Sequence, residues 1–245
     1  MSESSRVLTL FSREMGKVKG VGKGVGRPKS KLGGKVELFN LIEGDFYKKE
    51  TSELGILSDA GLLEDFRHIS EDPRKFGFAS AWCEVLDKTL QLEEPHSEIF
   101  KLTTEFFRLL HMVKTEVSGL IFWSAVMKFL VGEGYSPTLE ECVTCGNPIN
   151  MEKVMISLQR GGATCRNCLE ADEPIITISH ATLQLLRDMM KLPLSKLAEL
   201  KIDDRTGRLA AEVILSLASY HMNLPRNLKS FKFLESLIGV NRKGI

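Results

Sequence analysis

The sequence has little that would place it in a membrane or outside the cell. Its most apolar stretch, residues 120–131, includes Lys128 and is shorter than the about 20 residues that a helix needs to cross a bilayer. The first residues do not combine a basic start with an apolar run, so we expect no secretory signal. Cysteines number five, an odd count, which fits a reducing compartment better than a secreted disulfide framework. We therefore expect a cytoplasmic protein without a membrane partner.

The motifs of several enzyme classes are also missing. The glycine-rich segment at residues 16–34 matches neither G-x-x-x-x-G-K-[ST] nor G-x-G-x-x-G, which argues against nucleotide hydrolysis. The five histidines are scattered, and no two of them lie four residues apart on one helix. Neither the H-x-E and P-C-x-x-C combination of zinc deaminases nor a Ser-His-Asp arrangement is present. We therefore expect that the protein is not an enzyme.

The net charge is close to zero overall, but positive charge is concentrated in one segment. The formal net charge is only +1, yet residues 13–35 hold eight basic residues and one acidic residue. Dense positive charge on a glycine-rich backbone suits sequence-independent contact with phosphates. The candidate phosphate-contacting residues are Lys17, Lys19, Lys23, Arg27, Lys29, Lys31 and Lys35. A solvated basic loop without a partner is the alternative interpretation.

Four cysteines form two CxxC pairs, and their spacing indicates a metal site. The pairs are separated by nineteen residues, within the range typical of four-cysteine zinc sites, and the ligands would be Cys142, Cys145, Cys165 and Cys168. Four thiolates close the coordination shell, so we expect one structural zinc ion per chain rather than a catalytic one. A thioredoxin-type redox pair is less consistent with two such pairs. Cys83 lies on an apolar helical face, and we expect it in the core.

Hydrophobic periodicity changes along the chain and divides it into parts. Residues 7–57 read as short strands between glycine-rich turns, at 7–11, 17–23, 35–47 and 54–57, which indicates a small barrel or sandwich. A helical period then predicts helices at 59–68, from Pro73, after Pro95, at 117–131, at 179–190 with Ser179 as N-cap, at 194–200 and at 205–222. We expect a multidomain α+β protein with domains at 1–57, 58–137 and 177–245, the last two forming one helical domain around a zinc-binding lobe at 138–176.

The sequence resembles the RecO family of bacterial recombination mediators. The resemblance is carried by RVLTLFSREMGKVKGVGKGVGRPKSKLGG (6–34), ELGILSD (53–59), LVGEGYSPTLEECVTCG (130–146) and GGATCRNC (161–168). It implies an N-terminal OB-fold, a helical domain and an inserted zinc lobe. It also implies binding of single- and double-stranded DNA, strand annealing, cooperation with RecR, contact with the acidic tail of single-strand binding protein (SSB), and help for RecA in displacing SSB. A bacterial cytoplasmic, nucleoid-associated location follows from the same resemblance.

One departure from that family concerns the first strand. Its members begin with a further strand before the position of residues 3–6, so the resemblance implies that the start lies upstream or that the barrel closes differently. Two alternatives to a DNA-binding mediator stay open from sequence. One is a zinc-stapled scaffold for protein partners with incidental DNA contact, and the other is a metal-dependent enzyme.

Overall fold

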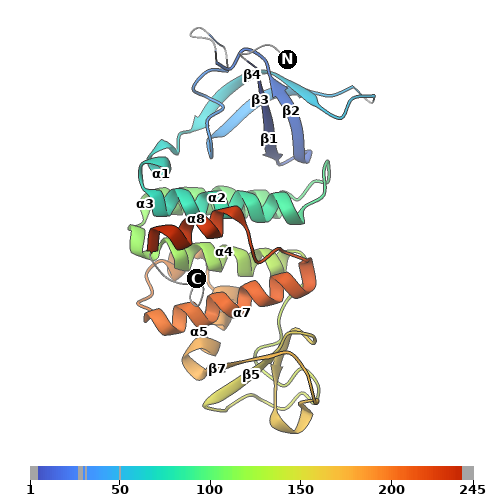
Figure 1. Ribbon diagram of the computed structural model, residues 1–245, viewed down its shortest axis with the longest axis vertical. Coiled ribbons are helices and arrows are strands. Elements are labelled where there is room, and N and C mark those ends of the chain that lie inside the picture. The colour runs from blue at the N-terminus through green and yellow to red at the C-terminus, as the bar shows by residue number, and fades with distance from the viewer. Residues whose placement is uncertain (1–4, 27–29, 31, 50, 239–245) are drawn as a thin grey trace.

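The computed structural model describes residues 5–26, 30, 32–49 and 51–238. It stacks a sheet, a layer of helices and a second, smaller sheet along the long axis of the molecule (Figure 1). The chain runs from the first sheet into the helices, leaves them for the smaller sheet, and returns to the helices before its carboxyl end. The predicted order of strands, helices, cysteine lobe and helices is therefore confirmed.

The amino-terminal sheet is open in the part of the chain that the structure describes. Its strands are β1 (Arg6–Ser12), β2 (Gly16–Gly22), β3 (Leu41–Tyr47) and β4 (Gly55–Glu64), in the order β1-β2-β4-β3. The β2–β4 pair is parallel and the other two pairs are antiparallel, so β1 and β3 form the edges. A small core of Val25, Leu32, Leu57 and Ala60 belongs to this sheet alone. The closed OB-fold barrel stays a prediction.

Two predicted elements near this sheet are wrong. The sequence predicts a helix at residues 59–68, but β4 continues through Glu64 and the helix α1 spans only Arg67–Glu71. Strand pairing with β3 overrides the local helical spacing of the apolar residues. The predicted strand 35–47 begins only at Leu41, because Phe39 has a φ of 70° and turns the chain away from the sheet. The Phe39 ring instead packs against Phe76 and Phe107 of the helical layer.

The helical layer follows the predicted pattern closely. Its other elements are α2 (Pro73–Thr89), α3 (Ser97–Met112), η1 (Thr115–Val117), α4 (Ser118–Gly132), α5 (His180–Lys191), α6 (Leu194–Leu197), α7 (Asp204–Met222) and α8 (Lys229–Ile238). The Asp72 carboxylate accepts hydrogen bonds from the main chain at the start of α2, where Pro73 occupies the first position. Ser179 caps α5 as predicted, because its hydroxyl accepts a hydrogen bond from the Thr182 N–H.

Helix α4 is the central helix of the core. Ile121, Phe122 and Val126 are fully buried, and α2, α3, α5, α6 and α7 all pack against this helix. The span Thr115–Gly132 is apolar and long enough to cross a membrane by length and composition, and 56% of it is buried inside the structure. Such burial is what the core helix of a globular protein shows. One core prediction is wrong, since Cys83 on α2 is exposed.

The cysteine-rich lobe is an insertion between α4 and α5. It contains β5 (Lys153–Ser157), β6 (Gly162–Thr164), η2 (Arg166–Cys168) and β7 (Ile175–Ser179), with the sheet order β6-β5-β7. Val154, Ile156 and Ile178 are buried and belong to the same core as the helical layer. The lobe is therefore packed onto the helices by its sheet and forms the end of the molecule opposite the amino-terminal sheet (Figure 1).

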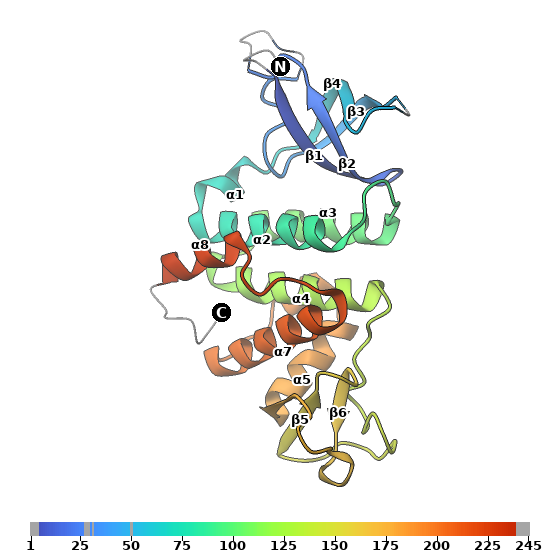
Figure 2. The ribbon, with the colours of Figure 1, turned by 45° about the vertical axis from the view of Figure 1, so that its right-hand side comes forward.

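Helix α8 lies against α2 (Figure 2), and a carboxylate of α2 caps its first turn. Glu84 on α2 accepts hydrogen bonds from the Lys229 N–H, the Ser230 N–H and the Ser230 hydroxyl, at 3.1, 3.0 and 2.7 Å. Burial acts to raise the pKa of Glu84, but these hydrogen bonds outweigh it and hold the pKa below its ordinary value. The carboxylate thus serves as the N-terminal cap that α8 does not receive from its own chain segment.

We expect Glu84→Gln to detach α8 partly and to lower the free energy of unfolding by about 1–2 kcal/mol, the usual cost of losing a helix cap. Because the folded-state pKa is lowered, this contribution is complete above the ordinary glutamate pKa and is lost as the pH falls through the folded-state value. Urea denaturation at pH 7 and pH 4 measures it. The two proteins should converge at low pH, and the exposed α7 variant Glu212→Gln is the control.

Candidate metal centre and nucleic-acid interface

The structure brings the four predicted metal ligands together. The Sγ atoms of Cys142, Cys145, Cys165 and Cys168 all lie within 4.8 Å of one another, and the cysteines are free of disulfides. The Sγ atoms of Cys145 and Cys165 are 3.9 Å apart. In a tetrahedral zinc site with Zn–S bonds of about 2.3 Å, the sulfurs are separated by about 3.8 Å. The donor set is therefore compatible with a zinc ion.

Local backbone contacts build this arrangement. Gly146, directly after the first pair, has a φ of 70°, and its N–H donates to the Cys142 carbonyl at 2.9 Å to close a tight turn. The Val143 N–H donates to the Ala163 carbonyl at 2.8 Å, which ties this turn to the strand that leads into the second pair. The second turn is closed by the Cys168 N–H, which donates to the Cys165 carbonyl at 3.1 Å. Both turns are therefore formed and joined by the chain itself.

The electrostatic environment of the sulfurs favours anionic ligands. Cys142 is 1% exposed, and burial acts to raise its pKa, but main-chain N–H groups of Cys145, Cys165 and Thr144 outweigh burial and lower that pKa to about 5. Hydrogen bonding to the Cys165 and Cys145 sulfurs raises the pKa of the Cys168 thiol to about 12. The cluster therefore favours a thiolate at Cys142 and a protonated thiol at Cys168. A divalent cation would replace the thiol protons, as it does at thiolate sites in general.

Two of the predicted DNA-contacting residues lie on an open surface. Lys19 on β2 and Lys23, just beyond its end, are exposed, and their side chains make no ion pair or hydrogen bond within the described residues. Val18, between the lysines of β2, is 2% exposed and points to the opposite face, as alternation along a strand requires. These two cations are therefore available to a polyanion.

Two other predicted residues have partners inside the protein. Lys17 is 8% exposed, and its Nζ donates to the main-chain oxygen of Asp87 at 2.5 Å and lies 3.5 Å from the Asp87 carboxylate. The Nζ of Lys35 donates to the Ala60 carbonyl at 2.5 Å. Lys17 therefore connects the sheet to α2, and Lys35 connects its own loop to β4. Arg27, Lys29 and Lys31 lie outside the described residues.

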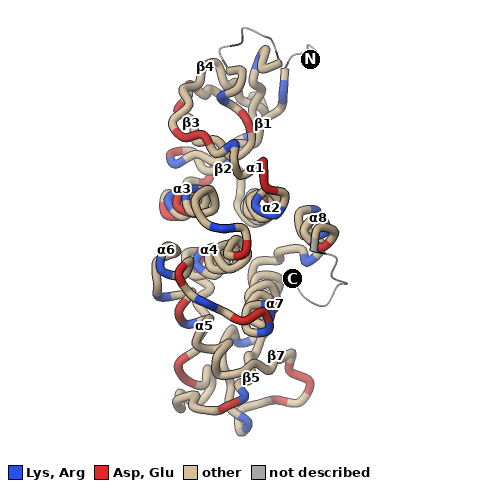
Figure 3. Tube along the Cα trace, turned by 90° about the vertical axis from the view of Figure 1, so that its left-hand side faces the viewer, with Lys and Arg blue, Asp and Glu red and all other residues tan. Residues whose placement is uncertain are grey.

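Charge is segregated across the amino-terminal sheet. Glu43, Asp45 and Asp59 are exposed on β3 and β4, and the red segments of β3 in Figure 3 show this acidic side. Lys19 lies on β2, toward the other edge in the order β1-β2-β4-β3. Within the four strands, the acidic side chains therefore lie on β3 and β4 and not on β1 or β2. The sequence alone does not predict this separation of charge, because it depends on the order of the strands in the sheet.

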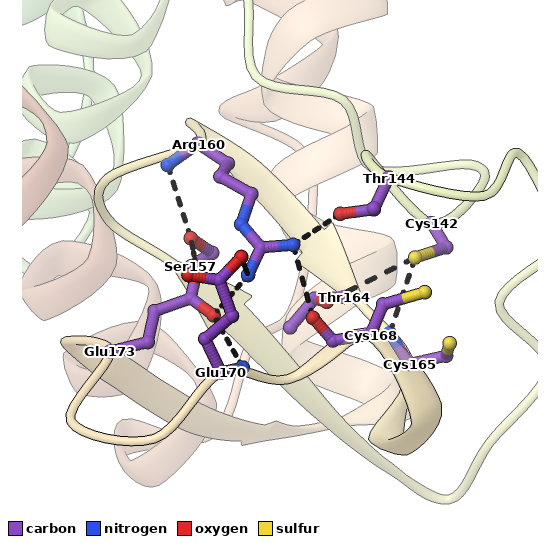
Figure 4. Close-up of polar contacts among 9 residues, drawn as sticks. All are labelled: Cys142, Thr144, Ser157, Arg160, Thr164, Cys165, Cys168, Glu170 and Glu173. Atoms are coloured by element: carbon purple, nitrogen blue, oxygen red, sulfur yellow. Dashed lines mark hydrogen bonds and ion pairs between the residues drawn. The ribbon is translucent and has the colours of Figure 1, made fainter.

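Arg160 is a further residue of the site that no sequence motif predicts. Its guanidinium lies between the two cysteine turns and donates to Thr144 and to the Cys168 carbonyl (Figure 4). Arg160 stands in a turn without any metal-ligand motif of its own. The sequence signal for Arg160 is its position directly before Gly161 and Gly162, which precede the second CxxC pair.

Comparison with known proteins covers most of the chain. The family model described as "Recombination protein O N terminal" matches residues 1–66, and "Recombination protein O C terminal" matches residues 70–230. Among curated relatives, "DNA repair protein RecO" of Desulfitobacterium hafniense is 31% identical over 98% of this chain and 86% of its own length. The proteins of the same name from Desulforamulus reducens and Bacillus cereus are 29% and 28% identical, over 98% and 96% of this chain and 91% and 92% of their own lengths.

The resemblance read from the cysteine and lysine segments is thus confirmed by matches that extend over both the sheet and the helical layer. A chain that both family models match, and that aligns with these relatives over nearly its whole length, belongs to the RecO family of DNA repair and recombination proteins.

Proposed function

We propose that this protein is a DNA-binding recombination mediator without enzymatic activity. In this role it anneals complementary strands and, together with RecR, helps RecA load onto single-stranded DNA covered by SSB, whose acidic tail it contacts. We place it in the bacterial cytoplasm, associated with the nucleoid. The observation that carries the proposal is the pair Lys19 and Lys23, exposed and uncommitted on one side of the sheet in a RecO-family chain.

The physical basis of annealing is charge neutralisation. Two complementary strands repel each other through their phosphates, and cations on a shared surface reduce that repulsion while they raise the local strand concentration. Contacts to phosphates carry no sequence information, so the protein would accept strands of any sequence. The acidic side of β3 and β4 would keep the strands on the β1–β2 side of the sheet.

The proposed zinc ion has a structural role. Four thiolates leave no open coordination position for a substrate or a water molecule, which argues against the metal-dependent enzyme considered above. The ion would instead hold the two cysteine turns of the lobe together.

Replacing Lys19 and Lys23 together with alanine tests the DNA surface. For single strands, each phosphate that the protein no longer neutralises makes the slope of log affinity against log salt less negative by about 0.7, so we expect a change of about 1.4. Fluorescence anisotropy with a labelled oligothymidylate between low and moderate salt measures the slope. The control replaces Lys153 and Lys201, which are exposed on other parts of the molecule, and should keep the original slope.

Lys17→Ala should lower the stability of the protein without changing the salt dependence of DNA binding. Removal of a buried ammonium leaves the Asp87 carbonyl without its partner, so we expect unfolding free energy to fall by about 1–3 kcal/mol while the salt slope stays unchanged. An altered slope for Lys17→Ala with unchanged stability would return this residue to the DNA surface.

Strand annealing with SSB-covered complementary oligonucleotides tests the proposed function as a whole. The wild-type protein should accelerate annealing, and the Lys19 and Lys23 double variant should do so less at equal protein concentration. A wild-type protein that binds no oligonucleotide even at low salt would refute the proposal, whether or not it is folded and contains zinc.

A further inference from the structure

The two cysteine turns are joined by a side chain as well as by the proposed metal. Arg160 lies in the turn between β5 and β6, and its side chain is only 19% exposed. Its Nη1 donates to the Thr144 hydroxyl, within the first CxxC, and to the carbonyl of Cys168, at the end of the second, the latter at 3.1 Å. One guanidinium nitrogen therefore contacts both turns (Figure 4).

The other side of the guanidinium is anchored in the lobe. Nη2 donates to the Glu173 carboxylate at 2.6 Å and lies 3.3 Å from that of Glu170. The Glu173 side chain is 2% exposed, and it also accepts a hydrogen bond from the Ser157 hydroxyl on β5. That hydroxyl in turn accepts from the Arg160 N–H at 3.1 Å. Together these contacts fix the orientation of the guanidinium plane. The side chain of a lone exposed arginine would not be oriented in this way.

These contacts have a consequence for metal binding. A metal ion that binds four sulfurs from two separate turns must hold those turns together, and the ordering cost reduces its affinity unless another contact supplies the order in advance. The planar guanidinium, with donors on two nitrogens, can span three chain segments at once. It does so here without contacting any sulfur by a hydrogen bond within the described residues.

We propose that Arg160 is a positioning residue of the metal centre, a clasp that holds the two cysteine turns in place before the metal binds. This inference rests on the proposed zinc site and deepens it. A simpler role, in which Arg160 only neutralises the buried Glu173, would leave the contacts to Thr144 and Cys168 without effect on the metal.

The test compares zinc affinity and zinc release, using the full-length protein and a chromophoric chelator in competition. Arg160→Gln should weaken zinc binding about tenfold or more, the usual cost of losing a group that orients metal ligands, and should accelerate release. Thr144→Val removes one clasp contact and leaves the Arg160–Glu173 pair intact, so it should shift affinity in the same direction by a smaller factor. Arg166→Gln is the matched control, because this exposed arginine stands inside the second CxxC.

Arg166→Gln removes the same charge from a position adjacent to a ligand, so an electrostatic effect alone would make it at least as damaging as Arg160→Gln. Equal zinc affinity for Arg160→Gln and the wild type, or equal losses for the two arginine variants, would overturn the clasp. If Arg160→Gln does not fold, Thr144→Val decides: wild-type zinc affinity in that variant would refute the proposal.

Hydrogen exchange of the metal-free proteins separates this inference from the zinc site itself. The main-chain N–H of Val143, bonded to Ala163, should stay protected in the metal-free wild type and should exchange at least tenfold faster in metal-free Arg160→Gln. A wild type that takes up no zinc would refute the metal centre, whereas the exchange comparison would still accept or reject the clasp.

Discussion

Replacing Cys142 with serine is expected to abolish stoichiometric zinc binding and to destabilise the outer lobe. Serine oxygen is a poor ligand for zinc beside three thiolates, and Cys142 is the most buried of the four ligands, with 1% exposure. Structural zinc supplies an apparent ~10–16 kcal/mol in zinc-finger peptides, so loss of the ion should remove several kcal/mol from the stability of the lobe. For a chain of this size, each kcal/mol lost lowers Tm by about 2–4 °C.

Zinc content by elemental analysis and thermal unfolding by circular dichroism measure these effects. The matched control is Cys83→Ser, because Cys83 is an exposed cysteine outside the cluster. It should retain one zinc ion per chain and the wild-type Tm. Full zinc content in Cys142→Ser would show that the four sulfurs are not the ligand set.

Gly16→Ala should separate the amino-terminal sheet from the helical layer. Gly16 begins β2 with a φ of 66°, and a Cβ at this position would lie 1.8 Å from the main-chain oxygen of Glu94. That oxygen belongs to the backbone of the α2–α3 connection, which β2 contacts through a hydrogen bond of 2.9 Å from the Glu93 N–H to the Lys17 carbonyl. Because a backbone atom cannot rotate away, the hairpin must move, and we expect a loss of roughly 3–5 kcal/mol.

Gly34→Ala provides the control for this variant. Gly34 also has a positive φ, of 72°, but a Cβ there would meet no atom of the described residues within 4 Å. It should therefore cost only the about 1–2 kcal/mol of a left-handed non-glycine residue. Hydrogen exchange at Glu93 should accelerate in Gly16→Ala and stay slow in Gly34→Ala. Equal effects on stability and exchange in the two variants would show that backbone strain, rather than contact with Glu94, explains the result.

The predictions from sequence succeeded where short-range patterns determine the structure. The two CxxC pairs identified the four sulfurs, because a two-residue spacing imposes a turn that presents both thiols to the same point. Helices were found where apolar residues repeat at helical spacing and where Pro73 or Ser179 starts them. The buried helix α4 was evident from its nearly uniform apolar composition.

The predictions failed where partners distant in sequence decide the outcome. β4 overrides a helical pattern because it pairs with β3, and Phe39 leaves the sheet because its ring packs against Phe76 and Phe107. Cys83 shares its helix with buried residues but lies on the exposed side.

Composition and spacing were enough to predict the four sulfurs as a donor set, the positive charge of residues 13–35 and the order of sheet, helices and lobe. Which lysines are available depends on the fold, because Lys17 and Lys19 have the same chemistry and strand face but different neighbours. It also placed Arg160 between two turns that are separated along the chain. The physical reason is that composition and spacing set what a residue can do, whereas burial and long-range contacts set which groups it meets.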